Sequence, residues 1–144
     1  MATNSAGTSA RQDPRQVSNT MRGTIAFNSA ATGVFVPLGV IPKGAWVISA
    51  QLSVDTAFNA GTTNTINFGT SGTPTQFLSA VAGGTVAVSA AATTALGKAA
   101  AAAGDTVIGL VYNFTGTTPT AGSAEFLLEY EGGFASIAGV EFSG

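Results

Sequence analysis

Three glutamates form the pattern in this chain that comes nearest to a chemical site. Glu125, Glu129 and Glu131 are separated by four and two residues on a predicted strand, so their side chains share one face. Same-face side chains two residues apart lie about 7 Å from each other. Such a row could bind a cation through oxygen ligands or supply the carboxylate pair of a glycosidase. Because Leu127 interrupts the row, the main interpretation is a solvent-facing or interface surface.

The residue types that most catalytic sites need are absent from the rest of the chain. The 144 residues include no His and no Cys. This excludes Ser-His-Asp and Cys-His nucleophilic sites, His-based zinc or iron sites and disulfides. Gly97 and Lys98 lack the flanking residues of a phosphate-binding P-loop. We therefore expect a protein that is not an enzyme and has no cofactor and no metal. Should calcium bind, Asp105 would join Glu125 and Glu129 as a first candidate ligand.

Charge is sparse and gives no sign of a nucleic-acid or membrane partner. Charged residues make up 8% of the chain, against a norm of about 25%, and the net charge is −2. The five basic residues are scattered, which disfavours binding to a phosphate backbone. Residues 1–16 contain no apolar segment of a secretory signal, and no run of 18 apolar residues occurs. We expect no signal peptide and no membrane span.

Small residues dominate the composition. Ala (26), Thr (20), Gly (19) and Ser (12) make up 77 of the 144 residues. The chain is long enough for one domain with a core, but small side chains bury little area each. A thin core favours association, because contacts between subunits bury apolar area that a monomer leaves exposed. We expect a self-associating protein, most simply a homotrimer.

Short alternating segments separated by Gly, Thr and Pro turns predict an all-β fold. Pro37 makes its strand an edge or bulged strand, because proline cannot donate to a ladder. Residues 42–44, Pro-Lys-Gly, predict a turn. The pattern is typical of an antiparallel β-sandwich or jelly roll. The expected strands are residues 20–28, 34–41, 45–55, 65–69, 77–80, 85–88, 105–114 and 123–131.

The clearest strand is predicted at residues 45–55. Trp46, Ile48, Ala50, Leu52 and Val54 alternate with a mostly polar set, as expected for a half-buried strand. We interpret Trp46 as the anchor of the core, the alternative being a platform on which a ligand stacks.

Two later segments carry further expectations. Residues 89–104 are rich in Ala, but Gly97 and two β-branched threonines disfavour a helix, so we expect a loop with at most one or two helical turns. The strands at 105–114 and 123–131 are expected to pair as a hairpin across a long turn.

The two ends of the chain are expected to be extended arms outside the sandwich of residues 20–131. Residues 1–19 form a polar N-terminal arm in which Arg11 and Arg15 could meet carboxylates on a partner. Residues 132–144 are more apolar than a solvated tail should be. The expected interface residues are Arg11, Arg15, Phe134, Ile137, Val140 and Phe142.

Residues 33–80 carry a resemblance to a known class of protein. The resembling features are an IPKGA turn at residues 41–45, a strand that runs into TAFN at 56–59, and INFGTSG at 66–72 followed by FL at 77–78. Downstream, TPTAG at 118–122 leads into a strand that ends at Glu129 and Tyr130. In these segments, and over roughly residues 21–131, the chain resembles small virion proteins of tailed bacteriophages.

That resemblance implies a role. Such proteins look like head decoration (cement) proteins, which have a β-sandwich or jelly-roll fold, are often trimeric and sit on the capsid lattice. It implies a non-enzymatic protein made in the host cytoplasm and placed on the virion exterior, where it binds and stabilises the major capsid protein. Related folds in tail and fibre components leave open a module that binds a host-surface glycan, with Trp46, Tyr112 or Tyr130 as stacking platforms. A small glycan-active enzyme is the weakest class, and no functional residue transfers from the resemblance.

Overall fold

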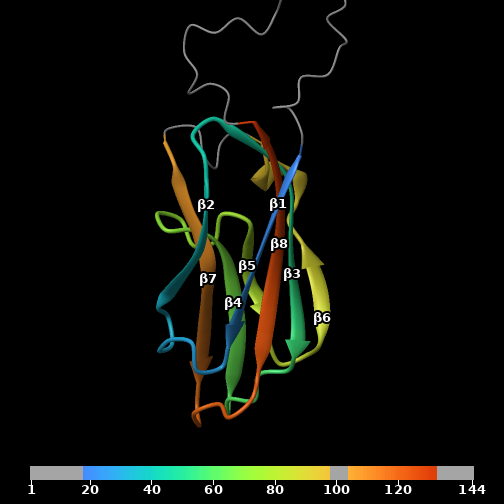
Figure 1. The fold of residues 1–144 in the computed structure, drawn as a ribbon. Helices are drawn as coiled ribbons and strands as arrows, with labels where there is room; N and C mark the ends of the chain where they lie inside the picture. The colour runs from blue at the N-terminus through green and yellow to red at the C-terminus, as the bar shows by residue number, and fades with distance from the viewer. Residues whose placement is uncertain (1–17, 98–103, 133–144) are drawn as a thin grey trace, which may run out of the picture.

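The computed structural model describes residues 18–97 and 104–132. In these residues the chain forms two layers of antiparallel strands, with one three-residue 3₁₀ helix, η2, at Thr93–Ala95 (Figure 1). The strands are β1 (Asn19–Ala26), β2 (Phe35–Ile41), β3 (Ala45–Thr56), β4 (Thr63–Thr70), β5 (Leu78–Ala82), β6 (Ala87–Ala90), β7 (Thr106–Thr115) and β8 (Ser123–Gly132). Each predicted strand is confirmed to within two residues at either end. The loop expected at 89–104 is also found as far as Gly97, apart from η2 and the last residues of β6; residues 98–103 lie outside the described part.

The strand order defines a jelly roll. One sheet has the order β1-β8-β3-β6 and the other has the order β2-β7-β4-β5, and every neighbouring pair is antiparallel. The pairs β1–β8, β2–β7, β3–β6 and β4–β5 are those of one long folded hairpin, wrapped so that it forms two packed sheets. This is the double-sheet arrangement of jelly rolls, and it confirms the predicted all-β sandwich.

The expected hairpin between residues 105–114 and 123–131 is wrong. β7 pairs with β2 and β4, whereas β8 pairs with β1 and β3 in the opposite sheet. The connecting loop therefore crosses from one layer to the other instead of turning back in the same sheet. The Asn59 side chain fixes this crossing, because its Oδ1 accepts hydrogen bonds from the backbone N–H groups of Thr120 (2.8 Å) and Ala121 (3.0 Å).

The proline and glycine signals around β2 are confirmed. β2 is an edge strand of its sheet, and its register shifts between Pro37 and Gly39. The turn after β2 closes with a hydrogen bond from Ala45 N–H to the Pro42 carbonyl (3.1 Å). Gly44 has a φ of 78°, a conformation that favours glycine. This turn carries the chain from one sheet to the other at the end of the sandwich where β1 begins and β8 ends (Figure 1).

The core consists of the inward side chains of both sheets. Phe126 of β8 and Phe68 of β4 meet across the layers with ring centroids 4.7 Å apart, and both side chains are fully buried. The rings of Tyr112 of β7 and Phe58 are also in contact, with their centroids 4.3 Å apart. The inward faces predicted for residues 105–114 and 123–131 are confirmed, since Ile108, Leu110, Ala124 and Leu128 are completely buried.

The expected core position of Trp46 is wrong, and the reason is a β-bulge. Val47 pairs with Tyr130 and Ser49 pairs with the next residue of β8, Glu129, so Ile48 is an extra residue in β3. An extra residue reverses the alternation of faces on one side of it. Val47 is therefore completely buried, while Trp46 is 56% exposed and Ile48 is 38% exposed. From Ala50 to Val54 the alternation follows the sequence prediction.

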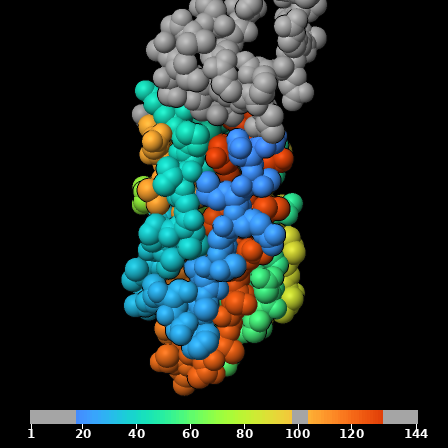
Figure 2. Space-filling view, in the orientation of Figure 1, coloured from blue at the N-terminus to red at the C-terminus, as the bar shows by residue number. Residues whose placement is uncertain are grey.

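Strands β1 and β2, although in different sheets, lie against each other and close one side of the sandwich (Figure 2). Two glycines allow neighbouring strands to approach closely in this region, Gly39 between β1 and β2 and Gly109 between β2 and β7. A Cβ atom at Gly39 would lie 2.2 Å from the sulfur of Met21, and one at Gly109 would lie 1.9 Å from the carbonyl oxygen of Val36. The backbone of β2 thus passes directly over Gly109, beside the register shift at Pro37.

We predict that Gly109→Ala lowers the free energy of unfolding by about 1–3 kcal/mol, as overpacking does, because the added methyl group meets backbone that cannot rotate away. Gly72→Ala is the matched control, since nothing lies within 4 Å of its Cβ position. It should change stability by less than about 0.5 kcal/mol. Urea unfolding of both variants measures the difference, and equal stabilities would contradict the close approach of β2.

We also predict opposite behaviour for two aromatic residues. Phe126→Ala should cost about 3–5 kcal/mol of unfolding free energy, because its ring is completely buried between the sheets. Trp46→Ala should cost less than about 1 kcal/mol, because the side chain is mostly exposed. Thermal or chemical denaturation provides the comparison. A Trp46→Ala cost as large as that of Phe126→Ala would mean that Trp46 is a core residue after all.

Candidate interaction surface

The outer face of the β1-β8-β3-β6 sheet combines exposed large apolar side chains with charged ones. Opposite residues in antiparallel strands share a face, so the rows Arg22–Leu127–Gln51 and Thr24–Glu125–Ser53–Val88 point outward together. Trp46 and Glu131 form a further outward pair near the end of the sheet. Of the large apolar side chains that are exposed in the described residues, this face carries Trp46, Ile48, Val88 and Leu127.

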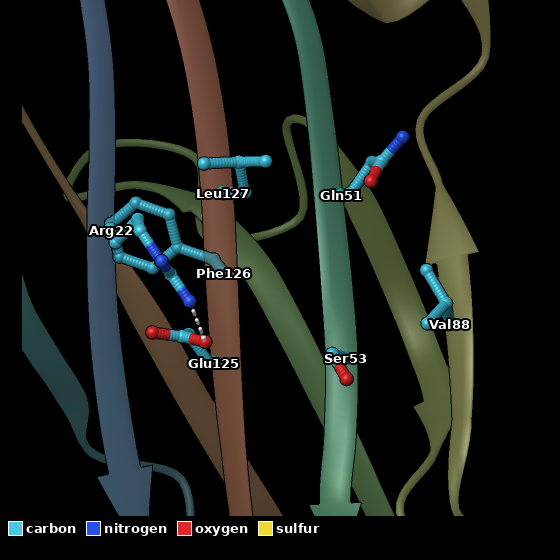
Figure 3. A pocket seen from close by; sticks show the side chains of 7 residues that line it. All are labelled: Arg22, Gln51, Ser53, Val88, Glu125, Phe126 and Leu127. Atoms are coloured by element: carbon cyan, nitrogen blue, oxygen red, sulfur yellow. Dashed lines mark hydrogen bonds and ion pairs between the residues drawn. The ribbon is translucent and has the colours of Figure 1, made fainter.

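The middle of this face is hollowed into a shallow groove of about 300 Å³. Figure 3 shows that it spans all four strands, with Arg22 on β1, Glu125 and Leu127 on β8, Gln51 and Ser53 on β3, and Val88 on β6. The groove is lined by both apolar and polar side chains. Such a surface suits a protein segment or a ligand that makes both kinds of contact.

One ion pair lies on the β1–β8 side of the groove (Figure 3). An Arg22 guanidinium nitrogen donates to Glu125 Oε1 at 2.8 Å (Figure 3). This hydrogen bond and the charge of Glu125 raise the pKa of Arg22. Both groups face solvent, Arg22 more than Glu125, so the pair contributes more to the charge pattern of the face than to stability.

The structure does not bring the candidate cation ligands together. Glu125 and Glu129 share the outer face of β8, as predicted, but Asp105 precedes β7 in the other sheet. Asp105 directly precedes β7, and its Oδ1 accepts a hydrogen bond from Lys43 N–H in the β2–β3 turn at 2.9 Å. Glu125 is close to the first residue of β8 and pairs with Ser53 near the end of β3, so it lies toward the opposite end of the sandwich. In residues 18–97 and 104–132, no three acidic side chains are grouped in a way that could hold a metal ion.

The three aromatic residues considered as stacking platforms differ in exposure. Tyr112 is buried, its hydroxyl donates to Asn64 Oδ1, and burial raises the pKa of its phenol. Tyr130 is half-buried and packs against the core. Trp46 alone among these three presents an open ring, at a position that sequence periodicity assigned to the core.

The interface residues predicted from the sequence belong to the two ends of the chain. Arg11, Arg15, Phe134, Ile137, Val140 and Phe142 all lie outside the described residues. The alternation of residues 123–131 correctly predicted the outward row of Glu125, Leu127 and Glu129. Their neighbours Gln51, Ser53 and Val88 were not predicted. No sequence signal could have placed them, because strand order is not encoded in alternation. Within the part of the chain that the structure describes, no helix has the length and hydropathy to cross a membrane.

Comparison with solved structures gives a consistent result. The fold is similar to a chain of the capsid asymmetric unit of the cyanophage Pam1, with 25% sequence identity and a TM-score of 0.67, over 84% of this chain and 89% of that chain. A chain of the capsid of Ralstonia phage GP4 has 22% identity and a TM-score of 0.61, with coverages of 84% and 88%. A chain of the acid-stable capsid of the Helicobacter pylori bacteriophage KHP30 has 19% identity and a TM-score of 0.60, with coverages of 83% and 90%. All three chains come from phage capsid structures.

These similarities span most of both chains, so the whole sandwich is shared and not one hairpin of it. At 22% and 19% identity, the Ralstonia and Helicobacter phage chains are informative about the fold alone. No protein-family model and no curated protein sequence matches the chain.

We predict that calcium does not stabilise this protein, because no three acidic side chains in the described part of the chain are grouped so that they could hold a metal ion. Adding calcium at millimolar concentration, or a chelator, should leave the melting temperature unchanged within experimental error. A bound ligand at one hundred times its dissociation constant would add about 2.7 kcal/mol and raise the melting temperature by several degrees. Such a rise, lost in Glu129→Gln but retained in Asp105→Asn, would reveal a calcium site on the outer face.

Proposed function

We propose that this protein is a non-enzymatic structural protein of a phage virion and, more specifically, a head decoration protein that binds and stabilises the lattice of the major capsid protein. The observation that carries the proposal is the match of the complete jelly roll to a chain of the Pam1 capsid. The sequence resemblance to small virion proteins of tailed phages points the same way. Fold alone does not imply function, so the charge and surface of this chain have to agree with the proposal.

The surface agrees with a role in assembly. A decoration protein acts through the area that it buries across the junctions between capsid subunits. The outer face of the β1-β8-β3-β6 sheet offers apolar side chains, including Leu127 and Val88, around the Arg22–Glu125 ion pair. Glu129 and Glu131 on the same face could meet the arginines of a partner, in the way that Arg11 and Arg15 could meet carboxylates. We propose that the copies on the particle form homotrimers on its exterior.

A tail or fibre module that binds a host-surface glycan is the second candidate. One observation favours it, namely the exposed ring of Trp46, since sugars stack on open aromatic faces. The burial of Tyr112 and the partial burial of Tyr130 leave this platform with one ring instead of three.

The position of the protein in the virion tests the proposal. Heads and tails of purified particles are separated and each fraction is analysed by mass spectrometry. A decoration protein should be found with the heads, in a fixed ratio to the major capsid protein. Recovery with the tails would support the second candidate and overturn the first.

We predict that the two ends contribute unequally to capsid binding. A variant with residues 18–132 retains all eight strands and should stay folded, but should bind undecorated capsids more weakly than the full chain. Removing residues 133–144 should do more damage than removing residues 1–17, because four large apolar side chains are lost, each worth about 1.5–3 kcal/mol when buried. Cosedimentation with capsids measures this. Equal binding by all of these variants would show that the ends are not contact elements.

A further inference from the structure

The bulge in β3 leaves an apolar patch at one end of the sandwich. Trp46 and Ile48 are 56% and 38% exposed, and they lie on the outer face close to where β8 ends. The strand partner of Trp46 is Glu131, one residue before the end of β8 at Gly132. An exposed Trp beside an exposed Ile is uncommon on a solitary soluble domain and is typical of a binding anchor.

The segment that follows β8 has the composition to cover such a patch. Residues 133–140 carry no charge and include Phe134, Ile137 and Val140, with Phe142 shortly after. The segment before β1 does not, because residues 1–17 include two large apolar residues, Met1 and Val17, and carry the charges of Arg11, Asp13 and Arg15. An apolar patch is filled by apolar side chains, so the C-terminal segment is the better match.

The strand register indicates which copy of the segment reaches the patch. At its end β8 has a neighbour on both sides, since Tyr130 pairs with Asn19 and Gly132 pairs with Ala45. A chain that continued in the direction of β8 beyond Gly132 would run away from its own patch, because Trp46 and Ile48 lie beside the residues before Gly132. To cover its own Trp46 it would have to reverse within a few residues. To cover the patch of a second copy it needs no reversal, and twelve extended residues reach up to about 40 Å.

We propose that residues 133–144 of one subunit dock on the Trp46–Ile48 patch of a second copy of this chain. This inference rests on the contact role proposed above for the C-terminal segment, and it names the surface that receives it. Phe134, Ile137 and Val140 are the anchors. Each exchanged segment covers the patch that the bulge exposes, so subunits are joined through their ends while the groove remains free for the capsid.

The single tryptophan of the chain makes the docking directly measurable. Emission of Trp46 and its quenching by acrylamide are followed in the full-length protein as concentration rises, alongside sedimentation velocity. Association should shift the emission to shorter wavelength and reduce quenching. A full-length variant with Phe134, Ile137, Val140 and Phe142 all replaced by Ser should remain monomeric, with Trp46 open to acrylamide at every concentration.

Two single variants keep the reporter and test the patch. Ile48→Ser should raise the dissociation constant of self-association about tenfold, which corresponds to 1.4 kcal/mol. Val40→Ser is the control, because Val40 is 50% exposed but lies on β2 in the other sheet, and it should leave the dissociation constant unchanged. Circular dichroism of each variant confirms that it is folded.

Three outcomes would overturn the inference. Trp46 could be fully open to acrylamide in an oligomer, which would place the contact elsewhere. It could be protected in a monomer at every concentration, which would mean that the segment folds back on its own subunit. Ile48→Ser and Val40→Ser could weaken association equally. None of these results bears on whether the protein is found with virion heads, so failure here is distinguishable from failure of the proposed function.

Discussion

The contact between the inward faces of the two sheets is the interaction on which the rest of the structure depends. More than half of the chain consists of Ala, Thr, Gly and Ser, so few large side chains are present to fill the space between the layers. Phe126 and Phe68 meet at its centre, and the surrounding aliphatic side chains are completely buried. With so little apolar volume between the sheets, each of these residues carries a large share of the small net stability of the fold.

Much of the fold could be predicted from alternation and turn residues. The long strands were found because apolar residues recur in them with a period of two, the short ones at 77–80 and 85–88 from the turn residues between them, and Pro37 correctly marked an edge strand. The pairing of residues 105–114 with 123–131 failed for a physical reason. Alternation shows which side of a strand is apolar, but two strands that face each other across a sandwich have the same pattern as two strands side by side.

The candidate surface was less predictable than the fold. Glu125, Leu127 and Glu129 were correctly assigned to one outward face, since they lie on a single strand. The exposure of Trp46 was missed because the bulge places Ile48, an ordinary strand residue, in an unpaired position without a glycine or proline to mark it. The groove depends on four strands that come from distant parts of the sequence. Its members could not have been grouped before the strand order was known.

The nested pairing also determines how this domain can be built. Arg22 and Glu125 are 103 positions apart in sequence, yet they lie on neighbouring strands. β8 is the last described strand to leave the ribosome, and it joins β1 to β3. Until it emerges, β1 has no neighbour in its sheet and β3 has only the four-residue β6. The first strand to be synthesised can therefore pair only after the last one has emerged. Proteins that depend on such long-range pairing fold slowly. The β2-β7-β4-β5 sheet has all of its strands before β8 is made, whereas the β1-β8-β3-β6 sheet cannot be completed until β8 emerges, so the inward face of β1 has no sheet to belong to until synthesis of the sandwich is nearly finished.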